Sequence, residues 1–164
     1  MKRSLWAVFW IFAAAVLQGN MPTALSIFGA KPDLFLVAVI TYSLGSNPVA
    51  SAAVGLFAGI VQGFSVGASL GSFALTRMLA GFLGGFCTVH VFSENLFVPA
   101  GSAFVLTAVS ELGFLLANPQ IAQGPVWQII VGESICNALI IVVVLFLARI
   151  GERRRKFRLI ESRL

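Results

Sequence analysis

Apolar residues fill six segments of the chain, and short stretches rich in Gly, Pro, Ser or Asn separate them. An α-helix needs about 20 predominantly apolar residues to cross a bilayer, and most of these segments approach that length. The pattern predicts an all-α integral membrane protein folded as a six-helix transmembrane bundle. The expected spans are residues 5–17, 34–44, 49–64, 70–91, 96–116 and 126–150.

The second expected span is short for a membrane crossing. Its eleven residues would cover roughly 17 Å as a helix, whereas the hydrocarbon core is about 30 Å thick. This helix must borrow flanking residues, thin the bilayer, or be shielded by its neighbours. A re-entrant second segment would leave five crossings instead of six.

The composition supports a membrane protein with little chain outside the bilayer. Of the 164 residues, 59% are hydrophobic and 10% are charged, whereas soluble domains carry roughly 25% charged residues. This excludes an ordinary soluble enzyme, a disordered tail and a coiled coil. We expect one transmembrane domain over residues 1–151 and a basic cytoplasmic tail over residues 152–164.

The positive charges lie at the two ends of the chain. Nine of the eleven Lys and Arg residues flank the first and last spans, and the net charge is +5. Basic flanks mark cytoplasmic ends, so both termini are expected inside, with an even number of crossings. A nucleic-acid site would need cations interleaved with aromatics on a folded face, so no nucleic-acid partner is expected. The tail cations either orient a solvated tail or contact anionic lipids or a partner; they are Arg153, Arg154, Arg155, Lys156 and Arg158.

Small residues recur every fourth position along the third span, at Ser51, Gly55, Gly59 and Gly63. Residues at this spacing share one helix face. Membrane helices associate by close van der Waals packing, for which glycines provide a groove. The groove serves either packing within the bundle or docking of a partner's helix.

Three ionisable residues, Arg77, Glu111 and Glu133, lie inside the fourth, fifth and sixth spans. Each costs about 2.5 to 3.5 kcal/mol at a bilayer centre, so each should face protein or water. Their positions put them at similar depth in the outer leaflet, so we predict that Arg77 pairs with one or both glutamates. Asp33 and Gln62 lie at the outer ends of their spans and could join this cluster. Three roles stay open: a lock on helix registry, a polar cavity for a partner or ligand, and a proton or ion pathway.

The sequence offers little for catalysis or for cofactor binding. His90 is the single histidine, and Cys87 and Cys136 match no metal-binding or redox spacing. The inner glycines of the fourth span follow no strand and precede no Lys, so they do not form a phosphate-binding loop. We therefore expect no catalytic residue, no metal, no cofactor and no enzyme activity.

The middle of the chain resembles the rod shape-determining protein MreD family over about residues 31–86. The resemblance rests on Lys-Pro-Asp-Leu-Phe-Leu at residues 31–36 and Gly-Leu-Phe-Ala-Gly-Ile-Val-Gln-Gly at residues 55–63. It continues through Gly-Ala-Ser-Leu-Gly at residues 67–71 and the glycine-rich fourth span. The family commonly has an acidic residue where this chain has Gln62, so a carboxylate role at that position does not carry over.

This resemblance implies a noncatalytic subunit of the bacterial elongation machinery in the cytoplasmic (inner) membrane. MreD-like proteins act with MreC, the MreB cytoskeleton, the glycosyltransferase RodA and its partner transpeptidase in lateral peptidoglycan synthesis. Their fold is similar to the substrate-binding subunits of energy-coupling-factor transporters. A small-molecule-binding subunit of such a transporter is therefore the alternative function.

Overall fold

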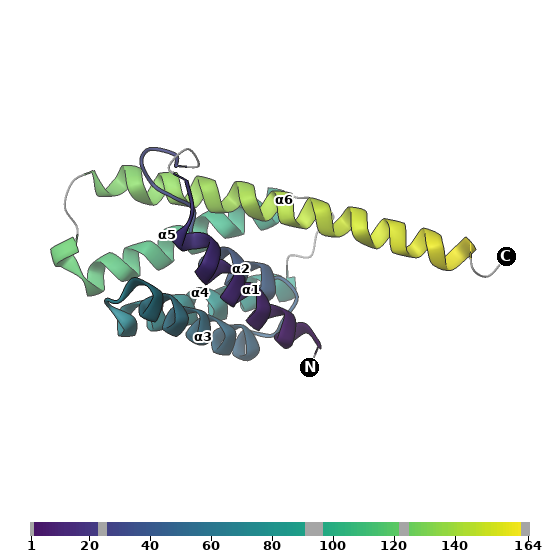
Figure 1. Ribbon diagram of the computed structural model, residues 1–164, viewed down its shortest axis with the longest axis horizontal. Helices are drawn as coiled ribbons and strands as arrows, with labels where there is room; N and C mark the ends of the chain where they lie inside the picture. The colour runs from purple at the N-terminus through teal and green to yellow at the C-terminus, as the bar shows by residue number, and fades with distance from the viewer. Residues whose placement is uncertain (1, 23–25, 91–96, 122–124, 162–164) are drawn as a thin grey trace.

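The computed structural model describes residues 2–22, 26–90, 97–121 and 125–161, and these form six α-helices and one short 3-10 turn (Figure 1). The predicted all-helical architecture is confirmed. The helices are α1 (Lys2–Gly19), α2 (Leu34–Ser43), α3 (Pro48–Val66), α4 (Leu70–His90), α5 (Phe97–Ala117) and α6 (Val126–Glu161), with the turn η2 (Pro119–Ile121) after α5.

Four of the described helices, α3 to α6, are long and apolar enough to cross a membrane. Two shorter apolar stretches, Leu5–Gly19 and Leu34–Ser43, lie in α1 and α2. The expected helix boundaries differ from the observed ones by three residues or fewer, except at the end of α6. The chain is therefore a membrane protein by the length and composition of these helices.

The short helix α2 is the centre of the bundle. It contacts all five other α-helices, and Phe35, Leu36, Val39 and Ile40 are fully buried or nearly so. Apolar residues cover all sides of α2 because protein surrounds it on all sides. A short helix can borrow flanking residues, thin the bilayer or be shielded by its neighbours. Shielding by neighbouring helices fits this arrangement.

Helices α3 and α4 form an antiparallel hairpin with direct backbone contact. A Cβ atom at Gly55 would overlap the carbonyl oxygen of Arg77, and one at Gly59 would overlap that of Phe73. A Cβ atom at Gly63 would lie 2.6 Å from the Cα of Leu70. From the opposite side, Gly81 lies against the backbone of Ser51. The small-residue face of α3 is therefore filled by α4.

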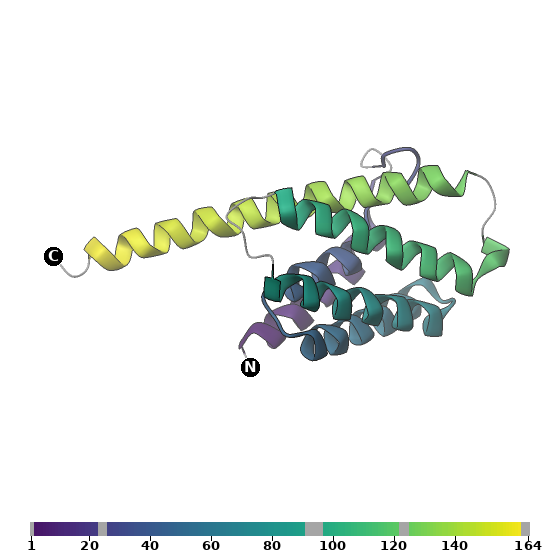
Figure 2. The same ribbon diagram turned by 180° about the vertical axis from the view of Figure 1, so that it is seen from behind.

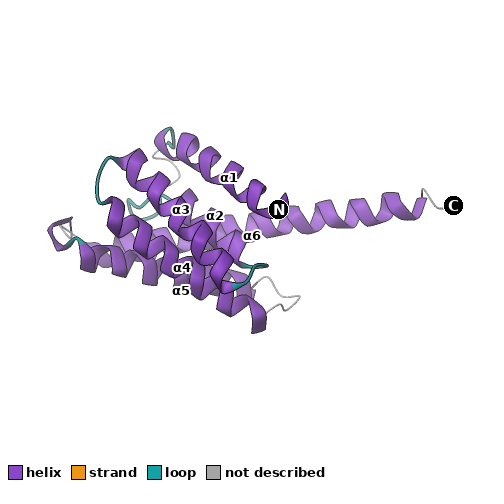
Figure 3. Cartoon of the chain, turned by 90° about the horizontal axis from the view of Figure 1, so that it is seen from below, coloured by secondary structure: helices purple, strands orange, loops and turns teal. Residues whose placement is uncertain are grey.

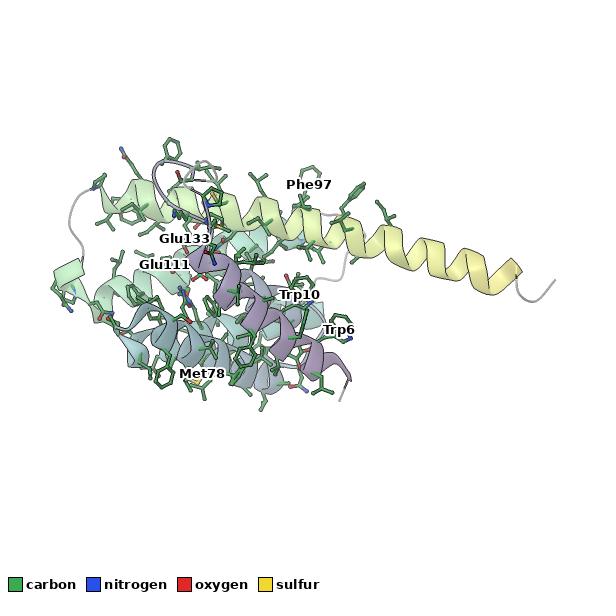
Figure 4. The ribbon with its side chains drawn as sticks, viewed as in Figure 1. Trp6, Trp10, Met78, Phe97, Glu111 and Glu133 are labelled. Carbon is green, nitrogen blue, oxygen red and sulfur yellow. The ribbon has the colours of Figure 1, made fainter. Side chains whose placement is uncertain are left out.

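Helix α1 and helix α5 lie at opposite edges of the bundle, with α2, α3 and α4 between them (Figure 3). Helix α1 contacts α2 and α3 alone among the described helices. Its outer face carries Trp6 and Trp10 (Figure 4), and both indole rings are exposed. Such a face suits contact with lipid near a membrane interface.

Helix α6 continues far beyond its apolar part. Its apolar stretch covers Val126–Ala148, yet the helix runs on to Glu161. Figures 1 and 2 show the additional turns projecting from the end of the bundle at which α1 begins. Helix α6 is therefore continuous across residue 151, where the basic tail was expected to begin. The basic segment continues the helix because Arg, Lys and Glu favour helix and no Pro interrupts them.

Candidate functional site

Arg77 is the centre of a buried polar cluster, which we define as Asp33, Gln62, Arg77, Ser110, Glu111 and Glu133. Arg77 lies in α4 and is 1% exposed. Its Nε donates to Gln62 Oε1 at 3.0 Å, and its Nη1 donates to Ser110 Oγ at 2.6 Å. Its Nη2 donates to Asp33 Oδ2 at 2.5 Å. The guanidinium therefore connects α4 to α3, to α5 and to the start of α2.

Asp33 has two roles, one for each of its carboxylate oxygens. It precedes the first residue of α2 with extended backbone angles, and its Oδ1 accepts from the N–H groups of Phe35 and Leu36 at 2.9 and 3.1 Å. Its Oδ2 accepts from Arg77 and from Gln62 Nε2, the latter at 2.8 Å. One side chain therefore caps a helix and neutralises a buried cation.

The start of α2 has side-chain acceptors for each of its first four N–H groups. Asn137 Oδ1 accepts from the N–H of Asp33, and Gln18 Oε1 accepts from that of Leu34, both at 2.9 Å. Asp33 Oδ1 accepts from the next two N–H groups, those of Phe35 and Leu36. A helix that begins inside an apolar bundle has no water for these groups, so side chains must satisfy them.

Gln62 bridges the two charged residues. Its amide oxygen accepts from Arg77 and its amide nitrogen donates to Asp33. A neutral amide can make both contacts at once, whereas a carboxylate here could only accept. The glutamine therefore fits this cluster without adding a negative charge.

The two glutamates differ in their contacts with Arg77. Glu111 Oε1 lies 3.0 Å from Arg77 Nη2, as an ion pair, without the alignment of a hydrogen bond. Glu133 lies beside it between α5 and α6 (Figure 4), and within the described residues it makes no hydrogen bond or ion pair. The predicted pairing of Arg77 with one glutamate is thus present, and Asp33 is its second, better aligned partner.

The cluster has more acidic than basic groups. Asp33, Glu111 and Glu133 each place a carboxylate oxygen within 4.8 Å of the others, and Arg77 is the one cation among them. Three such carboxyls could surround a metal ion, but the guanidinium already occupies Asp33 and would repel a metal. Because the three carboxyls outnumber the one cation, the cluster can instead accept a proton or a cationic group from outside.

An aromatic pair covers the guanidinium on one side. The Cζ atom of Arg77 lies 5.4 Å from the centre of the Phe73 ring, and Phe73 stacks on Phe114 with ring centres 4.4 Å apart. Such contacts stabilise a buried cation and exclude water from it. Glu111, by contrast, keeps 15% of its side chain exposed, so the cluster is more open at the glutamates.

The sequence indicated most members of the cluster and missed several polar residues around it. Asp33, Gln62, Arg77, Glu111 and Glu133 come together as expected. Ser110 was missed, as was the Asn137 amide, which donates to Thr107 Oγ1 at 3.3 Å. The only available signal was that the polar side chains of Thr107, Ser110 and Asn137 interrupt apolar spans. This signal is weak, because an uncharged polar residue costs little free energy in a membrane span.

The other expected site residues are not members of the cluster. Ser51, Gly55, Gly59 and Gly63 are buried between α3 and α4, where Gly55 brings α3 against Arg77. The five tail cations lie on the last turns of α6, and their side chains are outside the described residues.

Comparisons of this chain with protein-family models, curated proteins and solved structures found no match.

Proposed function

We propose that the chain is a noncatalytic membrane scaffold subunit of the bacterial cell-elongation complex. In this role it binds MreC, through the MreC transmembrane helix and adjoining segment, and helps to organise lateral peptidoglycan synthesis. RodA, its partner transpeptidase and MreB are further proposed partners, together with membrane lipids. The proposed location is the bacterial cytoplasmic membrane, with both ends of the chain inside.

The observation that carries this proposal is the internal pairing of the buried polar cluster. The nitrogens of Arg77 contact acceptors on α3, α5 and the start of α2. A group committed to holding helices together is not available to react with a substrate. The resemblance of residues 31–86 to MreD then supplies the biological setting.

The partner surface in this proposal lies away from the small-residue stripe. Helix α4 already fills that stripe, so a partner's helix would have to displace it. Replacing Gly55 and Gly59 by Leu would consequently damage the bundle itself, and loss of a partner in that variant would not locate the interface.

Co-purification tests the scaffold function directly. The tagged full chain is expressed with the MreC protein of the same genome and extracted in mild detergent. We expect MreC to elute with it at a fixed ratio, and an equally tagged multi-pass protein of similar size to elute without MreC. We also expect cells depleted of the chain to lose rod shape. Elution without MreC together with unchanged cell shape would reject the proposal.

The surplus acid in the cluster favours a second function, a small-molecule-binding subunit of an energy-coupling-factor-type transporter. Glu133 makes no hydrogen bond or ion pair with the residues that the structure describes, and Glu111 is partly exposed, an arrangement that suits a ligand with an amine or another cation. Native mass spectrometry of the purified chain distinguishes the two functions. A retained cationic small molecule that is lost in Glu133→Gln supports the transporter subunit, and an empty protein supports the scaffold.

A further inference from the structure

The connection between α1 and α2, which we define as the connector, comprises the described residues 20–22 and 26–32. It is not helical, and Ile27 and Ala30 close a tight turn in it through two backbone hydrogen bonds of 3.0 Å. This turn lies against the side of α6, because a Cβ atom at Gly132 would overlap the carbonyl oxygen of Ile27. Figures 1 and 2 show the connector beside α6, inward of the point at which that helix begins.

Contacts with α4 and α6 give the depth of the connector. We call the end of the bundle at which α4 and α6 begin its outer end. Gly132 lies about 9 Å inward from the first residue of α6. Asp33, which follows the connector, binds Arg77 at about 10 Å inward along α4 and Asn137 at about 16 Å inward along α6. The connector from Ile27 onward therefore lies about 9 to 16 Å from the outer end.

This depth is level with the lipid chains of an undisturbed bilayer. The apolar stretches of α5 and α6 have 21 and 23 residues, which cover about 31 and 34 Å as helix. The hydrocarbon core of a bilayer is about 30 Å thick. The outer ends of these helices therefore lie close to the boundary of the hydrocarbon, and the connector lies well inside that boundary.

The exposed groups of the connector do not suit contact with lipid chains. Asn20, Gly29 and Lys31 are exposed, and the ammonium of Lys31 donates to the carbonyl of Met21 at 2.9 Å. Phe28 is also exposed, but one apolar side chain cannot shield the backbone around it. Irregular backbone at membrane depth is found where protein covers it or where it meets water, and not against hydrocarbon. A polar environment must therefore cover the outside of the connector.

Helix α1 indicates a thin membrane on the same side of the bundle. Its apolar stretch, Leu5–Gly19, covers only about 22 Å. Near its outer end, Gln18 bonds to Pro32 and Leu34, so α1 stops at the depth at which α2 starts. Helix α1 lies at the edge of the bundle (Figure 3), and its Leu17 side chain is exposed. A bilayer can thin around a hydrophobic stretch that is shorter than its own thickness.

We propose that the outer leaflet is thinned beside α1, where phospholipid headgroups and their water reach inward to the connector. Lys31 binds the phosphate groups of these headgroups, because an exposed cation at this depth needs a counter-charge. The transmembrane helix of a partner fits less well, since it would bring apolar side chains to the Lys31 ammonium. This lipid contact is additional to the proposed binding of MreC and does not depend on it.

Spin labels at two matched depths measure whether water reaches the connector. The label is attached to Asn20→Cys or to Leu75→Cys in a full chain that carries Cys87→Ser and Cys136→Ala, in phosphatidylcholine nanodiscs. Leu75 is 62% exposed on α4. It lies two residues outward of Arg77, just as Asn20 lies two residues outward of Gln18, so it is the matched control on the lipid-facing side of a long helix.

We expect the label at Asn20→Cys to be at least about tenfold more accessible to a water-soluble nickel complex than the label at Leu75→Cys, since hydrocarbon excludes hydrated ions. Oxygen dissolved in the lipid should favour the label at Leu75→Cys. Equal nickel accessibility at the two positions would reject the proposal. Shielding of the label at Asn20→Cys from both reagents would also reject it, because protein would then cover the connector.

Fluorescence quenching tests whether headgroups are the cover. A bimane fluorophore at Asn20→Cys or Leu75→Cys is exposed to lipids that carry a nitroxide either on the headgroup or in the middle of the chain. We expect headgroup quenching to dominate at Asn20→Cys and chain quenching at Leu75→Cys. Adding Lys31→Leu should lower the headgroup quenching at Asn20→Cys, whereas Lys31→Arg should keep it.

Two results of the quenching experiment would overturn the proposal. One is dominant chain quenching at Asn20→Cys, which would mean that lipid chains cover the connector. The other is unchanged headgroup quenching in Lys31→Leu, which would remove the phosphate contact. Both experiments use the purified chain, so their failure leaves co-purification with MreC as a separate test of the scaffold function.

Discussion

Asp33 binds Arg77 with one carboxylate oxygen and caps helix α2 with the other. These two residues join the shortest helix of the bundle to α4 at a point where both are buried. The contact combines a hydrogen-bonded ion pair with a helix cap in one side chain, and substitutions can separate the two roles.

Asp33→Asn should keep the cap and remove the charge. Leaving Arg77 without its best aligned partner should lower the free energy of unfolding by about 3 to 5 kcal/mol, the usual cost of breaking a buried ion pair. Asp33→Ala should cost about 1 kcal/mol more, since it also removes the cap. Denaturant unfolding of the detergent-solubilised protein, followed by circular dichroism, measures both. Equal stability of Asp33→Asn and the unmodified chain would contradict a structural role for the pair.

Glu111→Gln and Glu133→Gln should have different effects on stability. Glu111 contacts Arg77, so its neutralisation should cost about 1 to 3 kcal/mol. Glu133 lacks such a contact, and removing its charge relieves repulsion from two nearby carboxyls, so its variant should be as stable as the unmodified chain or more so. The same unfolding measurement applies. A larger loss for Glu133→Gln would show that Glu133 has a stabilising partner in the membrane.

The double variant Glu111→Gln with Glu133→Gln tests whether the acidic groups are needed for function. If the cluster is only a registry lock, cells carrying the double variant should keep rod shape, and MreC should still co-purify. Loss of shape with a stable, correctly inserted protein would show that the carboxyls act on a ligand, a proton or a partner.

Gly59→Ala should destabilise the hairpin of α3 and α4. The added methyl group would overlap the backbone of α4, and forced overpacking costs about 1 to 3 kcal/mol. Gly101→Ala is the matched control, because a Cβ atom at Gly101 would meet nothing within 4 Å. This control should be neutral or stabilising by up to about 1 kcal/mol. Similar effects of the two substitutions would argue against close contact between α3 and α4.

Gln18→Ala should weaken the start of α2. The side chain of Gln18 accepts from the N–H of Leu34 and donates to the carbonyl of Pro32. Leaving these partly buried groups unpaired should cost about 1 kcal/mol. Gln128→Ala, at an exposed position of α6, should change stability little. An unaffected Gln18→Ala protein would indicate that water reaches the start of α2.

The sequence predicted the helices and the gathering of charged residues because both follow from local or strongly unfavourable energies. Long apolar runs have few alternatives to helix in a bilayer. An ionisable residue such as Arg77 must find a partner there. The choice of Asp33 over Glu133 as a partner was not predictable, because depth along each helix says nothing about which side of the helix faces Arg77.

Three further features were beyond prediction for different physical reasons. Uncharged polar residues such as Ser110 and Asn137 cost little in a membrane, so nothing in the sequence requires them to have partners. The helical path of residues 152–161 was not predicted, because helix-favouring residues such as Arg and Lys also suit a solvated tail. The glycine stripe predicted a close contact without identifying which helix would fill it.

The capping of α2 also sets the order in which the protein can be made. The N–H of Asp33 is paired with Asn137, which lies 104 residues later in the chain. Until the ribosome has produced α6, this group has no partner, and the ten-residue α2 is too short to remain in the bilayer alone. The start of α2 therefore reaches its fully capped state only after α6 has been made, although α2 is the second helix of the chain.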